Sequence, residues 1–104
     1  MTLEELTRKL DQAGAVVADK RLKIDFGLDG AIMLDGMAGR VSNTADEPAD
    51  TVVSISWADW MAVAAGTLDP MSAYMKGRLR IQGEMGPAMQ LQALFAKLRP
   101  SNGR

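Results

Sequence analysis

Residues 69–95 read DPMSAYMKGRLRIQGEMGPAMQLQALF, and this stretch carries most of the information about the fold. Its first part predicts a short helix at 70–76, because a proline suits the first turn of a helix and a glycine suits the position after its end. Residues 78–84 then alternate between polar and apolar side chains, which predicts a strand. The apolar residues that follow return to helical spacing and predict a last helix at 87–98.

The sequence before this stretch begins with a helix and continues with a hairpin. Thr2 and Glu5 have the spacing of a capping box and a leucine stripe follows, which predicts a helix at 3–17. Residues 21–28 alternate strictly and predict a half-buried strand. The side chains expected on its buried face are Leu22, Ile24, Phe26 and Leu28. An Asp-Gly pair, typical of a tight hairpin turn, comes next, so AIMLD at 31–35 is the expected return strand.

A second Asp-Gly pair predicts another reversal and a third strand near 39–45, at the edge of the sheet. TVVSIS at 51–56 predicts a fourth strand, and a helix is expected directly after it at 57–65. The fifth strand follows a helical crossover, which permits a parallel pairing. We therefore expect one domain over residues 1–104 with an α+β fold, in which helices cover one face of a five-stranded mixed sheet.

The composition excludes several kinds of site. The 104 residues include 12 Lys and Arg, 13 Asp and Glu, no Cys and no His, with a formal net charge of −1. Without His and Cys, Ser-His and Cys-His catalysis and the commonest metal ligands are ruled out, so we expect no metal and no other cofactor. The basic segments at 20–23 and 76–80 alternate with apolar residues, as on the wet face of a strand, and do not indicate nucleic-acid binding. No membrane-spanning run or signal peptide is recognisable, so we expect a cytoplasmic protein.

The carboxylates near the predicted strands are better explained by turns than by catalysis. Asp25, Asp29 and Asp35 fall in or beside hairpins, where Asp is a common turn former. No two carboxylates have a spacing that forces them together, as acid–base catalysis would require. We therefore expect no catalytic residue and a protein that is not an enzyme. The alternative is a small isomerase that uses one buried Asp.

The stretch at 69–95 resembles the signature of the sterol carrier protein type 2 family. The matching features are an Asp-Pro turn, an aromatic residue before a glycine, a basic alternating strand, a Met-Gly pair and an Ala-Met-x-Leu-Gln helix. They are carried by Asp69-Pro70, Tyr74, Gly77, Leu79, Ile81, Gly83, Met85-Gly86, Ala88-Met89 and Leu91-Gln92. Two positions differ from the family pattern, since Glu84 stands where Asp or Asn is common and Pro87 stands where Leu is usual.

This resemblance implies a protein that binds a fatty acid, a fatty acyl-CoA, a sterol-like molecule or a phospholipid. The ligand would lie in an apolar tunnel between the five-stranded sheet and its helices, with the strands in the order 3-2-1-4-5. The resemblance also implies ligand-binding roles for a set of apolar and polar residues. This set is Trp57, Trp60, Met61, Met71, Tyr74, Met75, Met85, Met89 and Gln92.

Each of these residues also has a plainer interpretation. Methionine is flexible and suits a cavity that must change shape, but methionines at helical spacing also fill ordinary cores. The tryptophans could simply pack a helix onto the sheet, and the Tyr hydroxyl and the Gln amide could face water. Arg78 and Arg80 could attract an anionic group or membrane, or could form the solvated face of a strand.

Two functional hypotheses follow. The first is a soluble lipid-binding or lipid-transfer protein. The second is a non-catalytic adaptor that presents an apolar biosynthetic intermediate, such as a quinone precursor, to enzymes. In both, the expected partner is an apolar lipid, with transient membrane contact, and the expected state is a monomer or a weak dimer.

Overall fold

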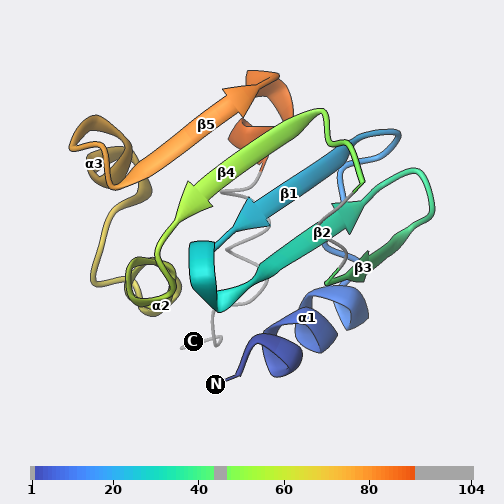
Figure 1. Ribbon diagram of the computed structural model, residues 1–104, viewed down its shortest axis with the longest axis horizontal. Coiled ribbons are helices and arrows are strands. Elements are labelled where there is room, and N and C mark those ends of the chain that lie inside the picture. The colour runs from blue at the N-terminus through green and yellow to red at the C-terminus, as the bar shows by residue number, and fades with distance from the viewer. Residues whose placement is uncertain (1, 44–46, 91–104) are drawn as a thin grey trace, which may run out of the picture.

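The computed structural model describes residues 2–43 and 47–90, which contain a five-stranded sheet (Figure 1). Its strands are β1 (Arg21–Asp25), β2 (Ala31–Asp35), β3 (Arg40–Ser42), β4 (Thr51–Ile55) and β5 (Leu79–Gly83). Their order is β3-β2-β1-β4-β5, which confirms the predicted α+β fold and strand order. The parallel pair is β1 with β4, whereas β5 pairs antiparallel with β4. The suggested parallel pairing of the fifth strand is therefore wrong, because the two helices before β5 return the chain to the end of β4.

The described helices are α1 (Leu3–Gln12), α2 (Trp57–Ala65) and α3 (Pro70–Met75), and residues 85–90 are also helical. The capping box of Thr2 and Glu5 begins α1 as predicted. However, α1 ends at Gln12 instead of residue 17, because the chain turns at Gly14, whose φ is 64°. The expected helix at 87–98 begins at residue 85, and its part from residue 91 lies outside the described residues.

The connection between β1 and β2 is longer than the predicted two-residue turn. The strand ends at Asp25, and a 3-10 helix, η1 (Gly27–Asp29), follows. The backbone N–H of Phe26 donates to the carbonyl of Gly30 at 2.8 Å and closes the loop, which opens with Gly27 in the left-handed region at φ 68°. Leu28 is consequently 108% exposed, and its predicted place on the buried face is wrong.

The core lies on the face of the sheet that the helices cover. The register places Leu22 beside Leu34 and Ile24 beside Ile32, with Val53 next in the same row as Ile24. The buried residues that pack on them from the helices are Leu6, Leu10, Trp60, Val63 and Ala73. Each fully buried aliphatic side chain of this kind contributes about 1.5–3 kcal/mol. In Figure 1, α1 lies along β3 and α3 lies at the start of β5.

The chain reaches β4 through Asp50, which holds three segments together. Its backbone N–H donates to the carbonyl of Arg21 at 2.9 Å, and its carboxylate accepts from the N–H of Arg21 at 2.8 Å. Its own carbonyl accepts from the N–H of Glu84 at 3.0 Å. The crossing segment is therefore fixed to β1 on one side and to the end of β5 on the other.

Candidate functional site

An aromatic corner closes the core at the end of β1. The ring of Phe26 meets Trp57 edge to face at 5.1 Å between centroids and meets Trp60 in the same way at 5.6 Å. Trp60 is 1% exposed, whereas Trp57 is half-buried. Both tryptophans thus pack α2 onto the sheet, and Met61 lies partly buried against the same core.

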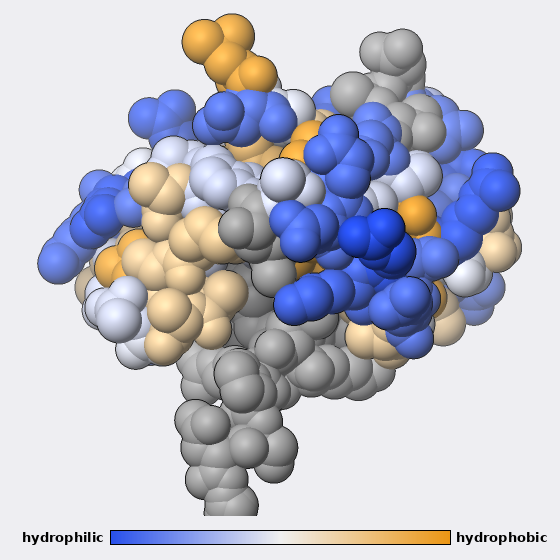
Figure 2. Space-filling model, turned by 90° about the horizontal axis from the view of Figure 1, so that it is seen from below, coloured by the Kyte–Doolittle hydropathy of each residue, from blue (hydrophilic) through white to orange (hydrophobic). Residues whose placement is uncertain are grey.

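The helix that carries these tryptophans is held at both ends and is apolar on most of its surface. Ser56 caps its start by accepting from the N–H of Asp59 at 3.1 Å, and Gly66 ends it in the left-handed conformation. Its outer positions are mostly alanine, with Met61 beside them. Figure 2 shows hydrophobic residues on the side of α2 and hydrophilic residues on the side of α1. Helix α2 therefore has apolar residues on both its inner and its outer face.

The other predicted lining residues are exposed. The exposed fractions are 49% for Met71, 44% for Tyr74, 79% for Met75, 47% for Met85 and 59% for Met89. Helix α3 precedes β5 and the helical residues 85–90 follow it. The two groups therefore lie at opposite ends of β5. This strand has five residues and rises about 3.3 Å per residue, so its length separates them.

The structure thus brings the two tryptophans together with Met61, but it does not bring the remaining methionines together. Gln92 lies outside the described residues. The expected tunnel stays a prediction, since the helix that would form one of its walls lies mostly outside them as well. Tyr74 is half-exposed on α3.

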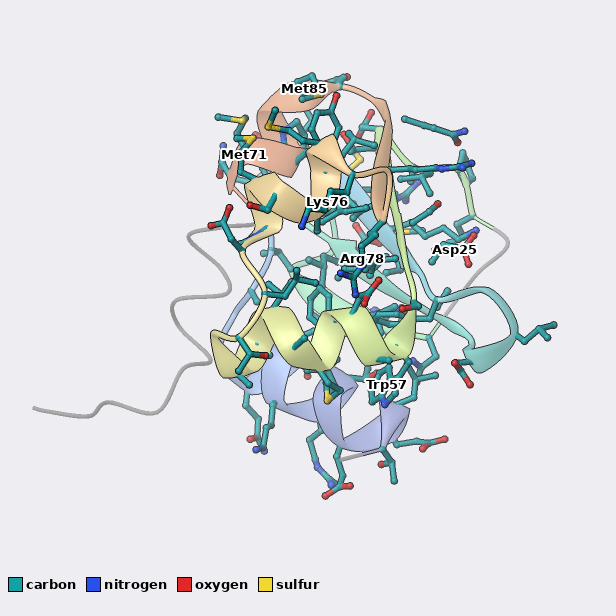
Figure 3. All side chains as sticks on the ribbon, turned by 90° about the vertical axis from the view of Figure 1, so that its left-hand side faces the viewer. Asp25, Trp57, Met71, Lys76, Arg78 and Met85 are labelled. Carbon is teal, nitrogen blue, oxygen red and sulfur yellow. The ribbon has the colours of Figure 1, made fainter. Side chains whose placement is uncertain are left out.

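A polar hollow opens at the ends of β1 and β4, beside the start of β5, and we call it the sheet-end groove. Its volume is about 420 Å³. It is lined by Asp25, Phe26, Gly27, Ser54, Ile55, Ser56, Gly77, Arg78 and Arg80. Figure 3 looks towards this end of the sheet and shows Asp25 and Arg78 at the same level above α2.

The pairing of three strands explains why the groove exists. Asp25 on β1 pairs with Ser54 on β4, and Ser54 pairs with Arg80 on β5, so the three share one row on the face away from the core. Neighbouring strands lie about 4.8 Å apart, which separates the backbones of Asp25 and Arg80 by about 10 Å. The small side chain of Ser54 leaves the space between them open.

The two arginines of the groove differ in whether a carboxylate compensates their charge. The guanidinium of Arg78 donates to the carboxylate of Asp59 through Nη2 at 2.5 Å and through Nε at 3.2 Å. These hydrogen bonds lower the pKa of Asp59 and compensate the charge of Arg78. Arg80, by contrast, forms no ion pair within residues 2–43 and 47–90. Asp25 uses one carboxylate oxygen to accept from the N–H of Gly27 at 2.8 Å.

This arrangement can bind a polar group, and nothing in it resembles a catalytic set. Its hydroxyl groups, on Ser54 and Ser56, have no imidazole beside them, because the chain contains no His. Within the described residues, no three His, Cys, Asp or Glu side chains are grouped to hold a metal ion. No helix in the same part of the chain is long and apolar enough to cross a membrane.

The sequence alone did not reveal the groove. Asp25 reads as a turn former and Arg80 as part of a solvated strand face. Only the register of β1, β4 and β5 places the two in one row with a serine between them. The alternation within each strand is therefore not enough to predict the groove. The pairing of the three strands must also be known.

Comparison with known proteins identifies relatives over almost the whole chain. The model of the SCP-2 sterol transfer family matches residues 2–96. Sterol carrier protein 2 of Homo sapiens is 29% identical over 114 residues, which cover 100% of this chain. The chain spans 20% of the length of that relative.

Several solved structures share the fold, among them the following two. Sterol carrier protein 2 from Aedes aegypti, in complex with the C16 fatty acid palmitate, gives a TM-score of 0.75 at 15% identity, covering 95% of this chain and 100% of that one. The ubiquinone synthesis protein UbiJ-SCP2 gives a TM-score of 0.62 at 18% identity, covering 88% of this chain and 81% of that one. At these identities the likeness is one of fold.

Proposed function

Because this chain belongs to the SCP-2 sterol transfer family, we propose that it holds an apolar lipid between its sheet and its helices and carries it without chemical change. The proposed ligands are a fatty acid, a fatty acyl-CoA, a sterol-like molecule or a phospholipid. The observation that carries the proposal is the fold shared over 95% of the chain with a palmitate-bound carrier from Aedes aegypti. The absence of His and Cys supports a non-catalytic role.

In this proposal the aromatic corner and α3 form the apolar contacts to the lipid. Trp57, Trp60 and Met61 offer a rigid wall at the end of the core. Helix α3 has six residues and only Ala73 fully buried, so its attachment to the core is slight and it can move to admit a chain. Its exposed Met71 and Met75 would then close over the ligand, as flexible side chains can.

The same helix offers a place for transient contact with a membrane. Met71, Tyr74 and Met75 are exposed apolar side chains, and the cationic Lys76 follows directly. A carrier has to reach its lipid in a bilayer, and an apolar patch beside a positive charge suits an anionic membrane surface. Met85 and Met89, together with Gln92, which lies outside the described residues, complete the proposed set of ligand contacts.

The experiment that tests the proposal is a titration with fatty acids of increasing length, from octanoate through dodecanoate to palmitate. Binding is read from the emission of Trp57 and Trp60, which lie at the proposed wall. Each methylene removed from water contributes about 0.8 kcal/mol, so the dissociation constant should fall by up to about fourfold per carbon. An affinity that does not depend on chain length, or no binding of any chain, would contradict the proposal.

A second function is favoured by the fold shared with UbiJ-SCP2, a ubiquinone synthesis protein. In it, the chain would act as a non-catalytic adaptor that presents an apolar biosynthetic intermediate, such as a quinone precursor, to enzymes. Transfer of fluorescent lipid between vesicles by the purified protein alone would favour the carrier. Co-purification with a defined set of enzymes, together with a bound quinone precursor and no vesicle transfer, would favour the adaptor.

A further inference from the structure

We propose that the sheet-end groove binds the zwitterionic head group of a phospholipid, with the phosphate at Arg80 and the ammonium group at Asp25. The inference rests on the proposed lipid-binding function, which it deepens by naming the ligand class and the place of its polar end. The groove has a volume of about 420 Å³ and is wide open to solvent.

The first argument is the order of charges along the row. Asp25 and Arg80 have opposite charges and stand on strands that are separated by one intervening strand. A simple anion would be attracted by Arg80 but repelled by Asp25, whereas a head group with both charges complements the two ends. Ser54 lies between them, and its hydroxyl can donate to a phosphate oxygen.

The second argument is that Arg80 is the cation available to a ligand. Arg78 already donates two hydrogen bonds to Asp59, so it forms the wall of the groove with its charge compensated. Arg80 is exposed and has no ion pair within residues 2–43 and 47–90. A guanidinium is well suited to bind phosphate, since it presents several N–H donors in one plane.

The third argument is the position of the groove next to the core. Phe26 and Ile55 line the groove and also belong to the buried core cluster. Phe26 in turn contacts both tryptophans of the aromatic corner. Because Asp25, Ser54 and Arg80 lie on the face away from the core, the acyl chains of a phospholipid bound there would pass around the ends of β1 and β4, beside Phe26 and Ile55, to reach the helix-covered side.

The test compares three soluble ligands by calorimetric titration. These are dihexanoyl phosphatidylethanolamine, dihexanoyl phosphatidic acid, which has the same chains but no ammonium group, and dodecanol, which has no charge. The wild-type protein should bind the ethanolamine lipid more tightly than the phosphatidic acid. Arg80→Gln should weaken binding of both phospholipids by about three- to tenfold and leave dodecanol unchanged.

The matched variants separate the two ends of the head group. Asp25→Asn keeps an oxygen that can accept from the N–H of Gly27, so the loop is retained. This variant should bind the ethanolamine lipid more weakly and phosphatidic acid more tightly than the wild type does. The preference between the two lipids should therefore be reversed. Arg40→Gln removes an exposed cation on β3, which lies on the same face of the sheet but away from the groove. This variant should bind all three ligands with the affinity of the wild type.

A last measurement tests whether the groove binds a head group that carries no acyl chain. Titration of the labelled protein with O-phosphoethanolamine should shift the NMR signals of the Gly27, Ser54 and Gly77 amides, and Arg80→Gln should abolish the shifts. If these amides do not respond and both variants bind the phospholipids as the wild type does, the groove is not a head-group site, although dodecanol binding would leave the carrier function standing. If the amides respond but no chain is bound, the carrier function fails and the groove remains a site for the free head group.

Discussion

The guanidinium of Arg78 and the carboxylate of Asp59 form a two-point hydrogen-bonded pair between the start of β5 and the first turn of α2. The side chain of Asp59 is 16% exposed and that of Arg78 is 48% exposed. The pair joins two elements that are separated along the chain by the whole of α3. It thereby fixes one wall of the sheet-end groove and leaves Arg80 as the cation that faces it.

This pair predicts a specific dependence of stability on pH. The hydrogen bonds from Arg78 lower the pKa of Asp59 in the folded protein below its value in the unfolded chain. Its contribution to stability is therefore complete above the unfolded-state pKa, about 3.9, and is lost as the pH falls through the lower folded-state pKa. In urea unfolding, Asp59→Asn should have a lower midpoint at neutral pH and a smaller further loss below about pH 4.

The control for this prediction is Glu4→Gln, which removes an exposed carboxylate from α1. Because Asp35 also has a lowered pKa, through the N–H groups of Ala38 and Met37, the parent will lose stability in acid from more than one group. The comparison therefore depends on the difference between variant and parent. Parallel pH curves for Asp59→Asn and the parent would show that the pair does not stabilise the fold.

Replacing Gly83 by alanine is predicted to destabilise the fold more than the same replacement at Gly66. The φ of Gly83 is 94°, and a Cβ at this position would lie 2.3 Å from the carbonyl oxygen of Asp50. A left-handed backbone costs a non-glycine residue about 1–2 kcal/mol, and the clash adds to it, so Gly83→Ala should lower the free energy of unfolding by about 3 kcal/mol or more. Urea unfolding followed by circular dichroism measures the loss.

Gly66 provides the matched control, because its φ is 83° and, apart from its neighbours along the chain, no atom lies within 4 Å of the position of an added Cβ. Gly66→Ala should cost only the conformational part, about 1–2 kcal/mol. Equal losses in the two variants would mean that the approach of Asp50 to β5 does not constrain the fold.

Phe26 is predicted to stabilise the aromatic corner strongly. It is 4% exposed and contacts both tryptophans edge to face. Phe26→Ala should lower the free energy of unfolding by about 3–5 kcal/mol, and the emission of the tryptophans should shift to the red as water reaches them. Phe26→Leu, which keeps most of the volume, should lose less than half of that. A loss of under about 1 kcal/mol for Phe26→Ala would show that the corner relaxes around the cavity.

The sequence predicts those elements best whose ends have a local physical cause. Helix α2 has the predicted bounds because Ser56 caps its start and Gly66 ends it, and both effects act within one turn of the chain. The alternation of β1 likewise gives the buried face of Leu22 and Ile24. Strand order came from the family resemblance, since it depends on contacts between distant residues.

The errors arise where distant contacts override the local pattern. The prediction of a helix to residue 17 relied on Ala13 and Val17, but Ala13 is the C-cap of α1 and Val17 is buried in a segment without regular secondary structure. The alternation through Leu28 fails because the loop closes between Phe26 and Gly30. The sheet-end groove depends on the register of three strands, and no single segment of the sequence contains that information.

Met75 gives the sharpest test of the carrier mechanism. Its side chain is 79% exposed, so Met75→Asp should leave the free energy of unfolding within about 0.5 kcal/mol of the parent. If α3 closes over a bound lipid, however, the new carboxylate would be moved against an acyl chain without a partner, and the affinity for palmitate should fall by about tenfold. Met75→Leu keeps an apolar side chain of similar size and should change the affinity little.

The control is Met37→Asp, which places the same charge on another exposed methionine, in the turn between β2 and β3 and far along the chain from α3. This variant should bind palmitate as the parent does. Both aspartate variants are checked by circular dichroism and urea unfolding before the titration. If Met75→Asp is folded and binds palmitate as tightly as Met37→Asp, then α3 does not contact the lipid, and the ligand must be enclosed by the aromatic corner and the other helices alone.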